Sequence, residues 1–108
     1  MSDYKEILTF IPLHDNDNVA FGDDLIDGII EDIFETFGGC TKGAIGTGYW
    51  KESSETPVCV DTNFSLSFIV PANQVELART KVLEIGKLLK QKQMLFKVME
   101  ADIDFLDC

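Results

Sequence analysis

The chain has 108 residues, a hydrophobic content of 45% and a formal net charge of -10 at pH 7. This length and composition suit one globular domain with a modest core, so we expect a single domain over residues 1–108. A surface this acidic would repel phosphate backbones, which argues against direct binding to nucleic acid.

Residue patterns also indicate where the protein works. The N-terminal sequence MSDYKEI lacks the basic region and apolar run of a signal peptide. No apolar run approaches the roughly 18 residues that a membrane-spanning helix needs. The three cysteines, Cys40, Cys59 and Cys108, form no CxxC pair, which is typical of a reducing compartment and not of a structural zinc site. We therefore expect a cytoplasmic protein with no membrane contact and no bound metal.

A strand and a helix are predicted in the first third of the chain. Residues 6–13 (EILTFIPL) are typical of a strand, with Pro12 at its end because proline cannot donate to a ladder. In residues 23–37 the apolar side chains recur at three- and four-residue spacings, which predicts an amphipathic helix. Gly28 lies inside this helix at a cost of about 1 kcal/mol relative to alanine, and close packing on a sheet would explain it.

The ends of this helix also carry signals. Asp23 or Asp24 can cap its N-terminus, where acidic side chains complement the helix dipole. The pair Gly38–Gly39 is expected to end it, because glycine adopts the left-handed conformation of a C-cap without strain.

The clearest strand runs over residues 58–70, where apolar and polar side chains alternate. One face carries Val58, Val60, Thr62, Phe64, Leu66, Phe68 and Val70. The other face carries Cys59, Asp61, Asn63, Ser65, Ser67 and Ile69. Residues 44–51 are predicted as its partner strand, and the polar segment 52–57 as a hairpin loop. We expect the first face to meet the helices and the second to lie on the open side of the sheet.

The glycines of the partner strand do not form a cofactor motif. Residues 43–48 (GAIGTG) precede a strand, whereas the dinucleotide-binding pattern GxGxxG must follow a strand and open a helix. Gly46 and Gly48 indicate a bulge or the close approach of another backbone or a ligand. We therefore expect no bound cofactor.

A second helix and a last strand complete the pattern. Asn73 and Glu76 resemble a capping box, and an apolar stripe then continues to about Lys90. Residues 93–101 are predicted as a strand, and the acidic tail 102–108 either extends it or packs over an edge. The order strand, helix, strand, strand, helix, strand predicts an α+β, ferredoxin-like fold: a four-stranded antiparallel sheet with two helices on one face.

One group of side chains could bind a ligand. It lies on the two central strands and consists of Tyr49, Trp50, Asp61, Asn63, Ser65 and Ser67. An aromatic ring beside a carboxylate and hydroxyls can stack a flat ligand and bind its polar edge. Tyr49 and Trp50 are adjacent, so only one of them can point to that face. The alternative is a solvated or oligomer-facing sheet surface.

The central part of the chain resembles two related groups of proteins. The matching residues are Phe37-Gly38-Gly39-Cys40-Thr41, Gly48-Tyr49-Trp50 and Asp61-Thr62-Asn63-Phe64-Ser65, followed by a helix and a strand beginning Lys92-Gln93-Met94-Leu95. One group is a widespread bacterial family of small ferredoxin-like proteins, and the other is the phage S-adenosylmethionine lyases. The resemblance implies a trimer that binds S-adenosylmethionine between subunits, with a glutamate on the central hairpin strand. Asp61 stands at the comparable position, and its shorter side chain favours binding without turnover over lyase chemistry.

Two functions follow from these patterns. The first is a homo-oligomer that binds a nucleoside-type small molecule between subunits; if it is a lyase, Asp61 is the catalytic residue, through proton transfer or electrostatic stabilisation of the cationic centre. The second is a non-enzymatic inhibitor whose acidic first helix mimics nucleic acid and binds a basic protein partner.

Overall fold

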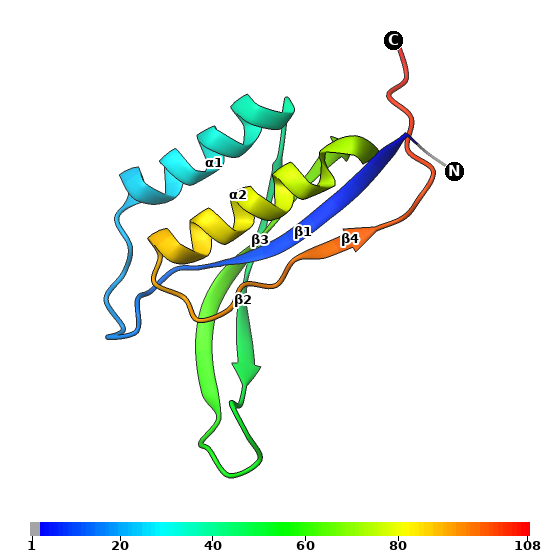
Figure 1. The fold of residues 1–108 in the computed structure, drawn as a ribbon. Helices are drawn as coiled ribbons and strands as arrows, with labels where there is room; N and C mark the ends of the chain where they lie inside the picture. Colours follow the sequence, from blue (N-terminus) through cyan, green and yellow to red (C-terminus); the bar gives the residue numbers. More distant parts are fainter. Residues whose placement is uncertain (1–2) are drawn as a thin grey trace.

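The computed structural model describes residues 3–108. Its elements are β1 (Tyr4–Pro12), α1 (Asp23–Phe37), β2 (Thr41–Trp50), β3 (Cys59–Pro71), a 3-10 turn (Ala72–Gln74), α2 (Val75–Leu88) and β4 (Lys97–Met99). The four strands form one antiparallel sheet in the order β2-β3-β1-β4. Both helices lie on the same face of this sheet (Figure 1). The predicted α+β, ferredoxin-like fold is confirmed.

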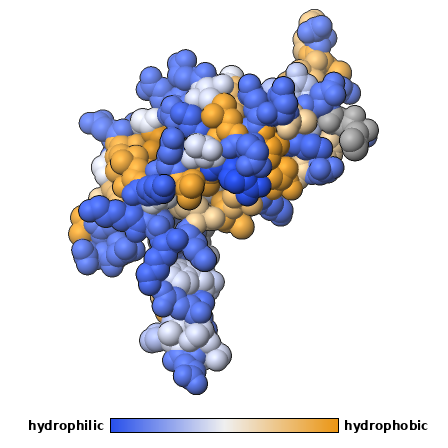
Figure 2. Space-filling view, in the orientation of Figure 1, coloured by the Kyte–Doolittle hydropathy of each residue, from blue (hydrophilic) through white to orange (hydrophobic). Residues whose placement is uncertain are grey.

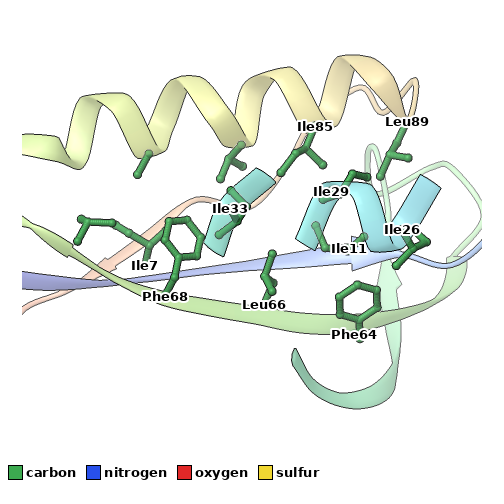
Figure 3. Packing of buried hydrophobic residues seen from close by; sticks show 13 residues of the cluster. Ile7, Ile11, Ile26, Ile29, Ile33, Phe64, Leu66, Phe68, Ile85 and Leu89 are labelled. Carbon is green, nitrogen blue, oxygen red and sulfur yellow. The ribbon is translucent and has the colours of Figure 1, made fainter. Parts of the chain in front are cut away.

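The hydrophobic core lies between the sheet and the two helices (Figure 3). The even-numbered face of β3 supplies its centre, as the alternation predicts: Phe64 and Leu66 are fully buried and Phe68 is 2% exposed. The ring of Phe68 stacks on that of Phe37, with centroids 5.2 Å apart. Full burial of each such side chain is worth about 1.5–3 kcal/mol, so this strand face contributes much of the driving force for folding.

Helix α1 has the predicted bounds, but its N-cap differs from the prediction. The N-cap residue is Gly22, and no side chain makes a capping hydrogen bond. Asp23 and Asp24 lie in the first turn, where their charges still complement the helix dipole. At the other end Gly38 adopts a left-handed φ of 92° and donates its N–H to Phe34 O at 2.8 Å. The predicted glycine stop is confirmed.

The start of α2 also departs from the prediction. Asn73 lies within the 3-10 turn, the N-cap is Gln74, and no side chain caps the helix. Glu76 instead pairs with Arg79 one turn later, with Nε and Oε2 3.2 Å apart. The predicted capping box is therefore wrong, because the glutamate is engaged by a neighbour on its own helix. The helix ends at Leu88, since Lys90 has a left-handed φ of 55°.

The last strand is much shorter than predicted. Only Lys97–Met99 pair with β1, and the segment before them runs as a loop. The side chain of Thr9 explains part of this path, because its hydroxyl donates to Leu95 O at 2.7 Å. The tail after β4 forms no regular element, and the ring of Phe105 packs edge-on against Tyr4, with centroids 5.2 Å apart. The tail thus contacts the sheet through this ring, stays largely exposed along its length, and does not extend the strand.

Hairpin β2–β3 extends beyond the helices at its distal end (Figure 1). The molecule measures 48 × 33 × 23 Å with a radius of gyration of 15.1 Å, against about 13 Å for a compact domain of this size. Its helix-side face leaves Ile45, Tyr49 and Val60 exposed, at 65%, 72% and 60% respectively. The hairpin is therefore too far from the helices to bury its own apolar side chains.

Among residues 3–108 no helix is long and apolar enough to cross a membrane.

Candidate functional site

Strand pairing decides which of the predicted side chains share a face. Directly opposed residues of an antiparallel pair point to the same side of the sheet. Gly48 lies opposite Asp61, and Trp50 lies opposite Cys59. Trp50 is therefore on the open face with the carboxylate. Tyr49 lies opposite Val60, on the face that the helices cover further along the sheet, so the structure does not bring it to the carboxylate.

The glycines of β2 make room for polar side chains of β3. A Cβ on Gly48 would lie 2.7 Å from Asp61 Oδ1 and 3.1 Å from Asn63 Nδ2. The carboxylate and the amide therefore converge over the same glycine. A Cβ on Gly43 would overlap with the hydroxyl of Ser65 in the same way. Glycine at these places lets the polar groups lie close to the backbone of β2, where a side chain would push them apart.

The predicted bulge is present, at a different place from the two glycines that suggested it. The register of β2 against β3 shifts by one residue between Lys42 and Ile45. The extra residue of a bulge bends its strand and increases its twist. Gly46 and Gly48 follow the bulge in regular pairing, and their role is the space they leave for Asn63 and Asp61.

The predicted site is spread along the strand and divides into two parts. Ser67 lies six positions after Asp61, which is about 20 Å at the usual rise of a strand. Asp61 and Asn63 form one part with Trp50 near the end of the hairpin. Ser67 belongs to the other end, where it lines a hollow of about 340 Å³ with Thr41.

Sequence reasoning missed an aromatic residue on this open face. Phe10 of β1 lies opposite Ser65 and is 39% exposed. Leu8 lies beside it in the same strand, opposite Ser67. The signal was present in the first strand, whose sequence EILTFIP is apolar on both faces and not on one alone. The serines thus lie beside an apolar surface, suited to the flat face of a ligand.

Among residues 3–108 the Asp61 carboxylate has no basic partner. The four ion pairs within residues 3–108 do not include it, and no side-chain hydrogen bond of this region reaches it. Its charge is therefore available to a cation from outside the chain. Lys92 pairs instead with Glu52. The hydrogen bond that its ammonium donates to Glu52 raises the pKa of Lys92, which favours the charged form.

The other candidate groups do not gather into a catalytic centre. His14 forms an isolated bridge with Ala20 at the end of the first turn. Burial raises the pKa of the Cys40 thiol, and its Sγ lies 3.9 Å from Ile30 O. Within the described part of the chain, no three potential metal-ligating side chains lie close together.

Comparisons with known proteins show a likeness of fold. The chain matches a phage S-adenosylmethionine lyase in complex with S-methyl-5'-thioadenosine with a TM-score of 0.69 and 13% identity, over 93% of this chain and 83% of that one. It matches the divalent ion tolerance protein CutA1 from Ehrlichia chaffeensis with a TM-score of 0.65 and 9% identity, over 97% and 87%. It also matches a DUF3240 family protein from Shewanella baltica with a TM-score of 0.59 and 16% identity, over 100% of both chains.

No protein-family model and no curated protein sequence matches the chain. The resemblance to the lyases that the sequence indicated therefore holds at the level of the fold.

Proposed function

We propose that this protein binds a nucleoside-type small molecule of the S-adenosylmethionine kind on the open face of its hairpin, between subunits of a homotrimer. The observation that carries the proposal is the convergence of Asp61 and Asn63 over Gly48, on a face shared with Trp50. An unpaired carboxylate suits a sulfonium or ammonium group, and an indole suits the stacking of a purine.

A single chain offers this ligand only one wall. Neither the hollow beside Thr41 and Ser67 nor the one between the two helices includes Asp61. Binding sites for small molecules usually bury 70–90% or more of the ligand. In a trimer each hairpin has two neighbouring subunits. One neighbour against the open face would supply the missing wall, and the other would contact the exposed apolar side chains of the helix-side face. The phage lyase of similar fold, with its bound S-methyl-5'-thioadenosine, supports the choice of ligand class.

The experiment compares two variants that lose one negative charge each. Asp61→Asn keeps the shape of the proposed site, whereas Glu55→Gln lies in the exposed hairpin loop. In calorimetric titrations with S-adenosylmethionine, Asp61→Asn should weaken binding by roughly 2–5 kcal/mol, because a desolvated charge pair is lost. Glu55→Gln should bind like the wild type. Uncharged S-methyl-5'-thioadenosine should lose much less affinity in Asp61→Asn.

Two outcomes would contradict the proposal. Equal affinity of wild type and Asp61→Asn for the cation would remove Asp61 from the site. The absence of binding of either compound to the wild type would remove the nucleoside class altogether. Mass spectrometry of the compound after incubation distinguishes binding from breakdown, and loss of breakdown in Asp61→Asn would give the carboxylate a catalytic role.

A second candidate function is favoured by the charge of α1. This helix carries six carboxylates and no basic residue, and its outer stripe of Asp27, Glu31 and Glu35 is exposed. Such a stripe would bind a basic protein partner in place of nucleic acid. Replacing the three residues with lysine should abolish displacement of labelled DNA from a basic DNA-binding protein, while the circular dichroism of the fold persists. Unchanged displacement would exclude the mimic.

A further inference from the structure

An apolar groove runs between the two helices on the outer side of the molecule. It has a volume of about 330 Å³, at the lower end of the range for ligand pockets. Its apolar walls are Leu25 and Ile29 of α1 and Ile85 and Leu88 of α2. Leu88 is 56% exposed, so water reaches an apolar surface that the fold does not use. Figure 2 shows hydrophobic surface in the region where the two helices lie.

Gly28 keeps this groove deep. It lies in the middle of α1 and lines the groove, yet a Cβ added to it would meet nothing within 4 Å. The expected packing of Gly28 on the sheet is therefore wrong. The other helix-interior glycine, Gly86, differs because its Cβ would lie 2.6 Å from Met94 Cγ. Glycine inside a helix lowers its stability, and at Gly28 no contact within the described chain requires it. A partner molecule that packs closely against α1 at this point would account for the glycine.

The rim of the groove has a net negative charge. Asp24, Asp32 and Glu84 lie along it with one lysine, Lys81. Lys81 is already paired with Asp32, with Nζ and Oδ2 3.1 Å apart. Asp24 and Glu84 have no basic partner within residues 3–108. The groove thus combines an apolar floor with two unpaired carboxylates, one on each helix.

We propose that this groove binds an amphipathic helical segment of a partner protein, with apolar side chains on one face and lysine or arginine beside them. Apolar anchors of such a segment would fill the space above Gly28, and its basic side chains would reach Asp24 and Glu84. The same carboxylates disfavour a second copy of this acidic chain at this place. The proposal goes beyond the second candidate function, because none of the stripe residues Asp27, Glu31 and Glu35 lines the groove. It does not require mimicry of nucleic acid.

A designed helical peptide of leucine and lysine, with the leucines on one face, tests the proposal. Binding of the labelled peptide to the wild type and to Gly28→Leu is measured by fluorescence anisotropy. The leucine side chain fills the groove without a change of charge. Gly28→Leu should weaken binding about tenfold or more, because a leucine anchor loses its place. Leu88→Asn, which removes part of one wall, should weaken it in the same direction. A scrambled peptide of the same composition should bind the wild type weakly.

Charge controls separate the groove from general attraction to an acidic protein. Glu84→Gln and Glu31→Gln each remove one charge, but only Glu84 lies on the rim. Glu84→Gln should weaken binding several-fold, and Glu31→Gln less than about twofold. Asp61→Asn should have no effect, so failure here is distinct from failure at the hairpin. The nucleic-acid mimic is tested separately, by whether DNA displacement is lost when the three stripe residues of α1 are replaced with lysine.

Three results would overturn the proposal. The first is equal affinity of wild type and Gly28→Leu for the peptide. The second is equal loss in Glu31→Gln and Glu84→Gln, which would show attraction by net charge alone. The third is a change in oligomeric mass on Gly28→Leu, which would show that a second copy of the chain occupies the groove.

Discussion

The two helix-interior glycines give a matched test at the scale of single residues. Gly28→Ala should raise the free energy of unfolding by about 0.5–1 kcal/mol, because the helix gains stability and the new methyl group meets open space. Gly86→Ala should lower it by roughly 1–2 kcal/mol, because Met94 must move away from a Cβ that would lie 2.6 Å from its Cγ. Urea unfolding of the three proteins checks both values. Changes of the same sign would contradict the packing described for one of the two glycines.

The cysteines should differ in their reactivity with pH. Burial raises the pKa of the Cys40 thiol above its usual value of 9.0, because the protein interior disfavours the thiolate. At pH 8 the reactive thiolate is then a smaller fraction of Cys40 than of an unperturbed thiol. We expect Cys40 to be alkylated by iodoacetamide more slowly than the exposed Cys59 and Cys108, and its rate to keep rising above pH 9. Peptide mass spectrometry at timed intervals measures the three rates, and a fastest reaction at Cys40 would contradict this prediction.

The face of Trp50 shows what the sequence does not reveal about single residues. Lys42 pairs with Leu66, but after the bulge Ile45 pairs with Phe64, one residue out of the earlier register. A slip of one residue moves every later side chain of a strand to the other face. Without the bulge Trp50 would point to the helix side. The choice between Tyr49 and Trp50 therefore depends on a local backbone feature that no side-chain alternation records.

At the scale of elements, β3 carries the strongest prediction of stability. Phe64 and Leu66 are fully buried. Phe64→Ala should cost roughly 3–5 kcal/mol, and Leu66→Asp should cost more, because it buries an unpaired charge. Ser65→Ala, on the open face between them, serves as the control and should change stability by less than about 0.5 kcal/mol. Urea unfolding measures all three, and a fully stable Leu66→Asp would mean that the strand register is wrong.

The elements differ in how well the sequence predicts them. The apolar spacing of α1 predicted its bounds, because the three buried isoleucines Ile26, Ile29 and Ile33 define one face. The caps were predicted less well, since a suitable side chain near a helix start does not guarantee the hydrogen bond. The last strand was over-predicted because its first residues take other roles. Met94 packs beside Gly86 of α2, so the chain joins the sheet only at β4, three residues later.

At the scale of the whole molecule, the sheet has an unprotected edge. β2 is an edge strand of ten residues, and its distal half lies on the extended hairpin (Figure 1). Edge strands of natural proteins are usually shortened, charged or covered, because unpaired backbone groups invite association. Here Lys42 is the only charged residue of the strand. The exposed edge and the apolar hairpin together support self-association.

The last prediction concerns that assembly. If the hairpin forms the contact between subunits, the wild type should have three times the 12.1 kDa mass of one chain in native mass spectrometry. Val60→Asp should give the monomer, because the contact would bury an unpaired carboxylate. Leu83→Asp is the matched control, since Leu83 on α2 is 57% exposed and Val60 is 60% exposed. The control should keep the wild-type mass. A monomeric Val60→Asp should also lose S-adenosylmethionine, because the site between subunits would no longer exist. A monomeric wild type, or a Val60→Asp protein of unchanged mass, would exclude the hairpin as the interface.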